Sequence, residues 1–119
     1  MDATPSPLEP LYAHRAKDCI GIGVPAGWVT LVLELHERLV EVSPDIRYVQ
    51  VKQKFGDLRV YVSVTNPAVD ALIWAAEERS RNTCDVCGEV GRGCVSDRGW
   101  YRALCPTHAD TLGYTEASP

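Results

Sequence analysis

The stretch that decides the fold is Cys84-Asp-Val-Cys87-Gly88, followed by Cys105-Pro-Thr-His108 with seventeen residues between Cys87 and Cys105. Two cysteines three positions apart can place both sulfurs on one metal ion. A following glycine permits the tight turn that aims backbone amides at sulfur. The second pair repeats this spacing with histidine as its last member, and Zn²⁺ prefers such sulfur and nitrogen donors. The pattern predicts one zinc ion, bound by Cys84, Cys87, Cys105 and His108.

The residues between the two pairs predict a β-hairpin and the start of a helix. Arg92–Ser96 and Trp100–Leu104 flank Asp97-Arg98-Gly99, which is typical of a turn between two strands. Pro106 suits the first turn of a helix, which would place the last two ligands one turn apart on the same side. Knuckle, hairpin and helix follow one another in the order of a treble-clef zinc fold. Because four protein ligands leave no position for water, the expected role of the zinc is structural.

Two cysteines are left over by this assignment. Cys94 lies inside the expected hairpin and is an alternative to His108 as the fourth ligand. Cys19 is expected to be a partly buried thiol. A nucleophilic role for Cys19 would need a nearby base, for which His14 and His36 are candidates, but the spacing does not demand either.

Two helices are expected upstream of the cysteines. Apolar residues recur at helical spacing over Trp28–Val42, and Ser43-Pro44 ends this helix because the residue before proline is pushed out of helical geometry. Asn66-Pro67 predicts a second helix start, with asparagine as the cap and proline in the first turn, and this helix ends near Ser80. The glycine-rich segment between Cys19 and Gly27 is expected to be a loop, without the Gly-Lys-Ser/Thr ending of a phosphate loop.

A β-hairpin is expected between the helices, with Ile46–Phe55 and Leu58–Thr65 joined by Gly56-Asp57. In this register Phe55 faces Leu58. Residues on the apolar face would be Val49, Val51, Phe55, Leu58, Val60, Val62 and Val64, and residues on the other face would be Tyr48, Gln50, Lys52, Lys54, Arg59, Tyr61 and Ser63.

The predicted fold is α+β, with two helices packed on a β-hairpin and followed by a treble-clef-like zinc module. Residues 1–10 contain three prolines and are expected to be a flexible tail. Residues 11–119 are expected to form a single compact domain. Its parts would be a helix and hairpin layer over 11–82, the zinc module over 83–112 and a loose C-terminal tail over 113–119.

The sequence indicates the cellular location of the protein. The sequence starts without the basic segment and apolar run of a secretory signal, and its longest largely apolar stretch, Trp28–Leu33, is too short to span a membrane. We therefore expect a cytoplasmic protein with no membrane association. In a reducing compartment, clustered cysteine and histidine hold metal more often than they form disulfides.

Enzymatic activity is not expected. Treble-clef nucleases need further histidines and an acidic or amide partner to hold a catalytic metal. Here the predicted module contains only His108, which is already assigned to zinc. A hydrolase or nuclease is therefore the least favoured class.

Two binding functions are considered, of which protein binding is preferred. The polar hairpin face interleaves basic and aromatic residues, as in nucleic-acid-binding surfaces, but a net charge of −4 gives the whole molecule a field that repels nucleic acid. Like charges on facing strands would be compensated by an acidic protein partner. Trp100 and Tyr101 are interface-type anchors, although one of them is expected to pack around the zinc site. The candidate partner-binding residues are Tyr48, Lys52, Lys54, Arg59, Tyr61, Arg98, Trp100, Tyr101 and Arg102.

Four motifs together resemble a group of small zinc-binding proteins of bacteria and their phages. They are the runs Val49–Val62, Ala76–Ser80, Thr83–Gly88 and Gly99–Cys105, and the chain departs from the pattern at Asp57, where glycine is expected. The resemblance implies a cytosolic, often phage- or prophage-encoded accessory protein, and it implies no reaction. Proteins of this kind often bind and redirect a host or defence protein, which is an argument by analogy.

Overall fold

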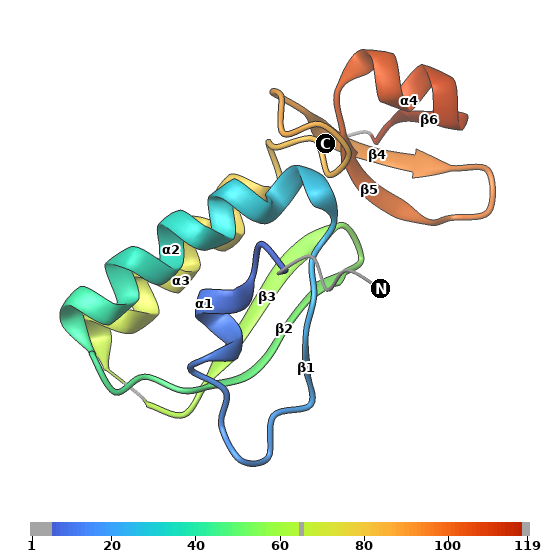
Figure 1. Cartoon of the computed structure of the whole chain (residues 1–119). Coiled ribbons are helices and arrows are strands. Elements are labelled where there is room, and N and C mark those ends of the chain that lie inside the picture. The colour runs from blue at the N-terminus through green and yellow to red at the C-terminus, as the bar shows by residue number, and fades with distance from the viewer. Residues whose placement is uncertain (1–5, 65, 118–119) are drawn as a thin grey trace.

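The computed structural model describes residues 6–64 and 66–117. Within these residues the chain is α+β, with four α-helices, one 3-10 helix and two three-stranded sheets (Figure 1). None of the described helices is long and apolar enough to cross a membrane. The elements are α1 (Glu9–Tyr12), β1 (Gly21–Ile22), η1 (Ala26–Trp28), α2 (Val29–Val42), β2 (Tyr48–Lys54), β3 (Asp57–Val62), α3 (Pro67–Ser80), β4 (Arg92–Ser96), β5 (Tyr101–Leu104), α4 (Pro106–Leu112) and β6 (Tyr114–Glu116).

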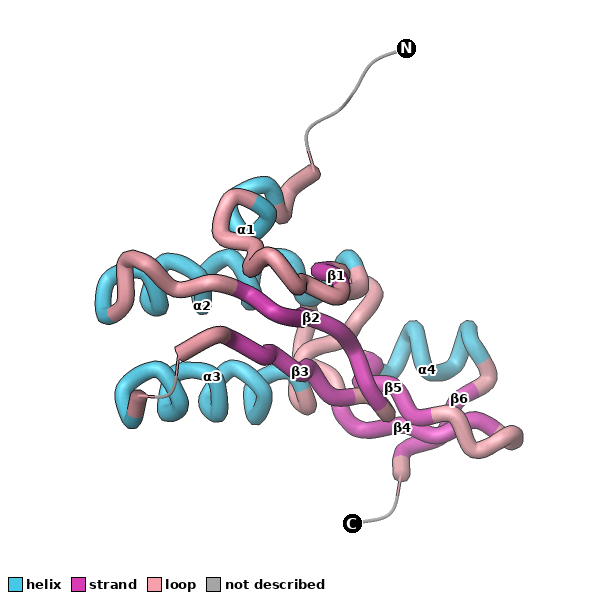
Figure 2. The backbone as a smooth tube through the Cα atoms, turned by 90° about the horizontal axis from the view of Figure 1, so that it is seen from below, coloured by secondary structure: helices cyan, strands magenta, loops and turns pink. Residues whose placement is uncertain are grey.

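The first sheet has the strand order β1-β2-β3, and α2 and α3 lie side by side on one of its faces (Figures 1 and 2). Both helices form where the sequence predicts them, and the side chain of Asn66 accepts hydrogen bonds from the amides of Ala68 and Val69. Val42, which the apolar spacing includes in the α2 stripe, is exposed in the last turn. The largest fully buried side chains of the main core are those of Trp28, Tyr48, Leu11, Leu39, Ile46 and Leu58.

The glycine-rich segment was expected to be a loop, but it contains β1. Gly21 and Ile22 pair in parallel with Gln50 and Val51 of β2. A two-residue strand carries no alternation of apolar and polar residues, so the sequence has no pattern that announces it.

The β2–β3 hairpin forms, but the predicted register is wrong. Val51 pairs with Val60 and Lys54 with Asp57, so the two turn residues are Phe55 and Gly56, both with positive φ. Positive φ at both turn positions is the geometry of a type I′ turn, whose twist matches that of the strands. From Gln50 to Lys54 each residue meets a partner two positions from the predicted one, which preserves the two faces along this part of the strand. Phe55, however, leaves the apolar face and is exposed in the turn.

Tyr48 was predicted on the polar face and is instead buried in the core. The pairing of β2 with β3 is irregular between Tyr48 and Gln50, where Tyr48 faces Val62 and Gln50 faces Tyr61. A β-bulge adds a residue to one strand and reverses the alternation beyond it. The hydroxyl of Tyr48 lies 2.8 Å from Nδ1 of the buried His36.

The end of α3 covers the edge of β3 that does not pair with β2. The Ser80 hydroxyl accepts a hydrogen bond from the amide of Leu58 at 3.0 Å, and the Glu77 carboxylate accepts one from the amide of Val60 at 3.2 Å. Glu77 itself is half-buried against the sheet. Pairing of these amides protects an edge strand that would otherwise offer them to another chain.

Both predicted tails contain ordered structure. Leu8 is buried in the core, and α1 begins at Glu9, so the prediction of a tail over 1–10 is wrong from residue 8 onward. Residues 1–5 of that prediction lie outside the described residues. At the other end, β6 pairs with β4 where a loose tail over 113–119 was expected, and Gly113 ends α4 in a left-handed conformation.

The second sheet has the strand order β5-β4-β6 and belongs to the C-terminal module. Strands β4 and β5 confirm the hairpin that the sequence predicts around residues 97–99. Helix α4 begins at Pro106, directly after Cys105, as its proline indicates. Figure 1 shows this module at the end of the molecule where α2 begins.

Candidate metal centre

The four predicted ligands come together in space. One donor atom from each of Cys84, Cys87, Cys105 and His108 lies within 4.8 Å of every other. Cys84 and Cys105 are buried, His108 is half-buried and Cys87 is exposed. The cluster therefore sits at the surface of the C-terminal module with one sulfur toward solvent, and it can hold a metal ion.

The distances within the cluster suit tetrahedral coordination. With metal–sulfur bonds of about 2.3 Å and metal–nitrogen bonds of about 2.0 Å, two sulfurs lie about 3.8 Å apart and sulfur and nitrogen about 3.5 Å apart. The Cys87 and Cys105 sulfurs are 3.9 Å apart, and the Cys84 sulfur is 3.6 Å from Nδ1 of His108. The Cys105 sulfur is closer to the same nitrogen, at 3.2 Å. The residues present thus fit one ion.

The first ligand pair sits in a tight loop. The amide of Gly88 donates to the carbonyl of Cys84 at 2.9 Å, and the amide of Cys84 donates to the carbonyl of Glu89 at 2.7 Å. Gly88 has a φ of +81°, which side chains other than glycine rarely adopt. The loop turns amides toward sulfur. Burial raises the pKa of Cys84, but backbone amides of Cys105, Cys87 and Val86 outweigh it and lower this pKa to about 6. A thiolate is the form that binds metal.

The second ligand pair is held by the start of α4. Cys105 is the residue that caps this helix, and His108 lies three positions later in its first turn. Residues three apart on a helix face the same side, so sulfur and imidazole converge. The prediction from Pro106 is confirmed.

Cys94, the alternative fourth ligand, is not part of the cluster. Its buried thiol lies 3.3 Å from the carbonyl of Arg92 and packs with Leu104 and Ala109. Burial raises the pKa of Cys94, which disfavours the thiolate that a metal requires. His108 occupies the fourth position instead.

Cys19 is half-buried against the main core. Both candidate bases have Nδ1 engaged elsewhere, since His14 bonds to the carbonyl of Ile46 and His36 to the Tyr48 hydroxyl. The two imidazole rings lie edge to face, with centroids 5.0 Å apart. These histidines belong to the packing between α2 and the first sheet.

The 3-10 helix η1, directly before α2, packs on the loop that carries Cys84 and Cys87, which we call the metal loop. The amide of Gly27 donates to the carbonyl of Asp85 at 2.9 Å, and a Cβ at Gly27 would lie 2.1 Å from the carbonyl oxygen of Cys84. The indole of the buried Trp28 donates to the carbonyl of Thr83 at 2.8 Å. Glycine at position 27 is thus required by the close approach of two backbones.

Asp85 is a buried residue of this site that was not predicted from the sequence. Its fully buried carboxylate accepts hydrogen bonds from Nε and Nη2 of Arg102, at 3.0 and 2.7 Å, and from Nε2 of Gln53 at 2.9 Å. These bonds join the metal loop to β5 and to β2 of the first sheet. The sequence contained one signal of a buried polar partner. Gln53 is a polar residue at an inward-facing position of its strand, and the other residues on that face are apolar.

The predicted partner residues divide into two groups. Lys52 lies directly opposite Arg59, as cross-strand like charges, and Tyr61 is exposed on the same face. Arg59 is 3.5 Å from the Asp57 carboxylate, which partly compensates this charge. Two predicted members lie elsewhere. Tyr48 is in the core because of the β-bulge, and Arg102 is turned inward because it binds the buried carboxylate of Asp85.

The aromatic residues of the second hairpin are both exposed. Trp100 is 66% exposed and Tyr101 is 51% exposed, so the expectation that one of them packs around the metal is wrong. Strand β5 begins only at Tyr101, and Trp100 belongs to the turn, where the alternation of strand residues does not apply. Phe55 is 77% exposed. It lines a groove together with both of these residues.

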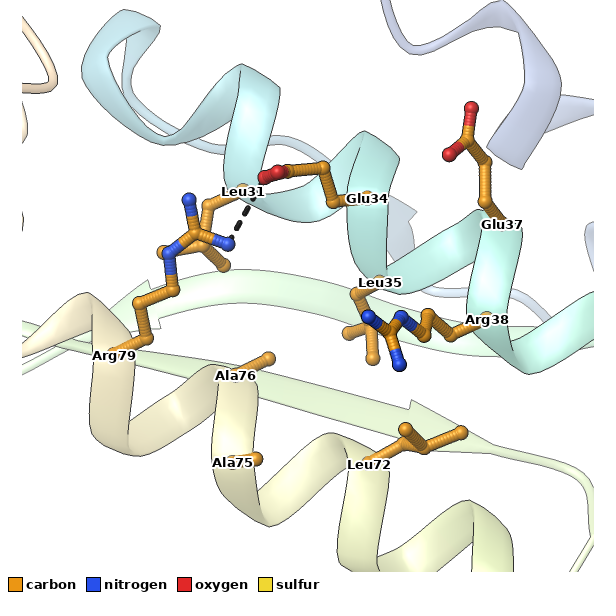
Figure 3. A pocket seen from close by; sticks show the side chains of 9 residues that line it. All are labelled: Leu31, Glu34, Leu35, Glu37, Arg38, Leu72, Ala75, Ala76 and Arg79. Carbon is orange, nitrogen blue, oxygen red and sulfur yellow. Dashed lines mark ion pairs between the residues drawn. The ribbon is translucent and has the colours of Figure 1, made fainter.

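A second groove of about 520 Å³ lies between α2 and α3 (Figure 3). Its floor is apolar, and Glu34 and Arg79 form an ion pair of 3.0 Å across it. The lining contains two carboxylates and two guanidinium groups, so their formal charges cancel.

The chain was compared with protein-family models, curated proteins and solved structures. None of them matches it.

Proposed function

We propose that this chain is a small protein-binding accessory factor in which a structural zinc module of the treble-clef type holds the recognition surface. The partner class that the resemblance implies, a host or defence protein, is part of this proposal. A cytoplasmic location agrees with it, because a reducing compartment keeps cysteine ligands as thiols.

Zinc as the metal is supported by the chemistry of the donors. Three sulfurs and one imidazole nitrogen at tetrahedral spacing are the donor set of many structural zinc sites. When bound, zinc would supply folding energy rather than a reactive water, since all four positions are taken by protein. The treble-clef assignment is supported by the order of the ligand loop, the β4–β5 hairpin and the start of α4.

The observation that carries the binding proposal is a cluster of exposed aromatic side chains. We call Phe55, Trp100 and Tyr101 the hairpin-junction patch, because the tips of the two hairpins meet there. Aromatic residues are enriched at the centres of protein interfaces, where they carry much of the binding energy. Large apolar side chains that contribute little to the core and share one groove are typical of a binding surface.

Affinity capture from a bacterial lysate tests the proposal when surface variants are compared side by side. The double variant Phe55→Ser/Trp100→Ser removes two anchors, and Trp74→Ser is the matched control because Trp74 is 65% exposed on α3, outside the patch. We expect a protein that is retained by wild type and by Trp74→Ser but lost with the double variant. If all three baits retain the same proteins, the patch is not the binding surface.

Nucleic-acid binding is the second candidate, and one observation favours it. On the open face of the first sheet, Lys52 lies opposite Arg59, and Gln50 lies opposite the exposed Tyr61. Basic and aromatic groups on a sheet face can contact phosphates and stack on bases. Binding of DNA and RNA oligonucleotides at low and physiological salt tests it. Tight, salt-sensitive binding that Lys52→Ala and Arg59→Ala weaken would support this candidate over protein binding.

A further inference from the structure

The hairpin-junction patch lines a groove of about 480 Å³ between the tips of the two hairpins. The β2–β3 turn lies against the backbone of β5, since a Cβ at Gly56 would be 3.2 Å from the carbonyl carbon of Tyr101. One wall therefore comes from the first sheet and the other from the metal module. The side chains of Arg98, Arg102 and Tyr114 line the groove together with the patch.

The charge of this groove is one-sided. Its lining contains two arginines and no carboxylate, although the whole chain has a net charge of −4. Arg102 is neutralised by the buried Asp85, and it also lies over the ring of Tyr114 at 5.8 Å. Among the described residues, Arg98 makes no ion pair. The Lys54 amine is a second cation at the rim, 5.8 Å from the centre of the Phe55 ring.

Neighbouring grooves lack this property. Beyond Tyr101, Arg81 and Arg92 are each paired, with Asp57 at 3.3 Å and with Glu116 at 3.7 Å. In the groove between α2 and α3 the formal charges cancel. Of these three grooves, the hairpin-junction groove is the one that combines an arginine outside any ion pair of the described residues with exposed aromatic side chains.

We infer that the hairpin-junction groove binds an acidic segment of a partner protein, with an aliphatic or aromatic side chain against the patch and a carboxylate on Arg98. This inference rests on the proposed function and names the chemistry of its partner. Aromatic rings supply apolar contact area, and a guanidinium binds a carboxylate in a planar, two-pronged geometry. Complementary charge then selects acidic over neutral segments and speeds their association.

A protein segment explains the groove better than a nucleic-acid strand does. Within the part of the chain that the structure describes, the groove offers one arginine outside any ion pair, Arg98, and one lysine at its rim, Lys54, which is too few cations for a strand that carries a phosphate on every nucleotide. A peptide needs only one or two carboxylates at the basic position.

Selection from a displayed random peptide library on the intact, metal-loaded chain tests this inference. We expect enriched peptides to carry Asp or Glu next to a large apolar residue. For a synthetic peptide chosen in this way, Arg98→Glu should weaken binding at least about tenfold, as for loss and reversal of an interfacial charge. Arg38→Glu, an exposed arginine in the groove between α2 and α3, is the matched control and should leave binding unchanged.

Three results would overturn the inference. Enrichment of neutral or basic peptides shows that another chemistry is recognised, and equal effects of the two charge reversals show that only net charge matters. Absence of any enriched peptide shows that the groove does not take linear segments. Each of these leaves the proposed function intact if lysate capture still depends on Phe55 and Trp100, so the two claims can fail separately. If an oligonucleotide displaces the selected peptide, the groove binds nucleic acid, and this result too would contradict the inference.

Discussion

The carboxylate of Asp85 accepts hydrogen bonds from both Nε and Nη2 of Arg102, at 3.0 and 2.7 Å. Asp85 follows the first candidate metal ligand, Cys84, and Arg102 lies on β5 three residues before the third candidate, Cys105. The pair therefore links the two segments that carry the ligands. With Gln53 as a further donor to Asp85, it also ties both segments to the first sheet.

Removal of Arg102 should be more costly than removal of the charge on Asp85. Arg102→Leu leaves a buried carboxylate without its cation and is expected to lower the free energy of unfolding by about 3 kcal/mol. Asp85→Asn keeps the shape and part of the hydrogen bonding, and a loss of about 1–2 kcal/mol is expected. Arg92→Leu, which breaks an exposed ion pair, should stay within about 0.5 kcal/mol of wild type. Urea denaturation measures all three, and an equal cost for Arg102→Leu and Arg92→Leu would refute this role.

Contact between Gly27 and the metal loop predicts a strong effect of one methyl group. A Cβ at this position meets the carbonyl oxygen of Cys84 at 2.1 Å, so Gly27→Ala must displace the backbone and should cost at least about 2 kcal/mol. Gly23→Ala meets nothing within 4 Å and should change stability by less than about 0.5 kcal/mol. Thermal and urea unfolding compare them, and similar stabilities would mean that the helix start does not pack on the loop.

Protection of the β3 edge predicts a cost for Ser80→Ala. The buried amide of Leu58 loses its acceptor, and an unsatisfied buried donor costs roughly 1–3 kcal/mol. Ser96→Ala removes a similar bond to the amide of Trp100, but at an exposed site where water replaces it. Its expected cost in urea denaturation is below about 1 kcal/mol. A larger loss for Ser96→Ala than for Ser80→Ala would contradict the edge-protection argument.

His36 predicts a loss of stability in mild acid. Burial lowers the pKa of His36 from its usual 6.5, the nearby His14 lowers it further, and Glu37 opposes the shift. Because the unfolded chain then binds more protons than the folded one, stability is fully present above pH 6.5 and is lost as pH falls toward the lowered pKa. The Tyr48 hydroxyl faces the same imidazole, and burial raises the pKa of Tyr48, so it stays neutral throughout.

The measurement for His36 is urea denaturation at about pH 7.5 and about pH 5.5. His36→Gln keeps a hydrogen-bonding partner for Tyr48 and removes the titrating group. It should show a smaller difference between the two pH values than wild type. The same difference in both proteins would show that other groups cause the acid sensitivity.

Local patterns in the sequence predicted the local parts of the structure. The ligand spacing, the β4–β5 hairpin, the proline at the start of α4 and the cap at Asn66 each depend on a few adjacent residues, and each is found where it was expected. Such features follow from donor chemistry and backbone geometry alone. The spacing of His108 from Cys105 likewise favoured His108 over Cys94 as the fourth ligand.

Features that depend on distant residues could not be predicted in this way. The pairing of β6 with β4, the burial of Leu8 and the parallel pairing of β1 arise from contacts that no local pattern encodes. The bulge that buries Tyr48 and the turn that exposes Phe55 are small backbone irregularities with large effects on which face a side chain occupies. The second of these changed the candidate binding surface, because Phe55 was expected in the core.

The metal content of the purified chain tests the central claim most directly. Elemental analysis of protein prepared without chelators should give one zinc per chain for wild type and for Cys94→Ser, whose thiol lies outside the ligand cluster. Cys105→Ser should lose the zinc and unfold at least the C-terminal third, because metal binding energy is folding energy in such sites. A wild-type protein without bound zinc, or a Cys105→Ser variant that keeps full stability, would contradict the account.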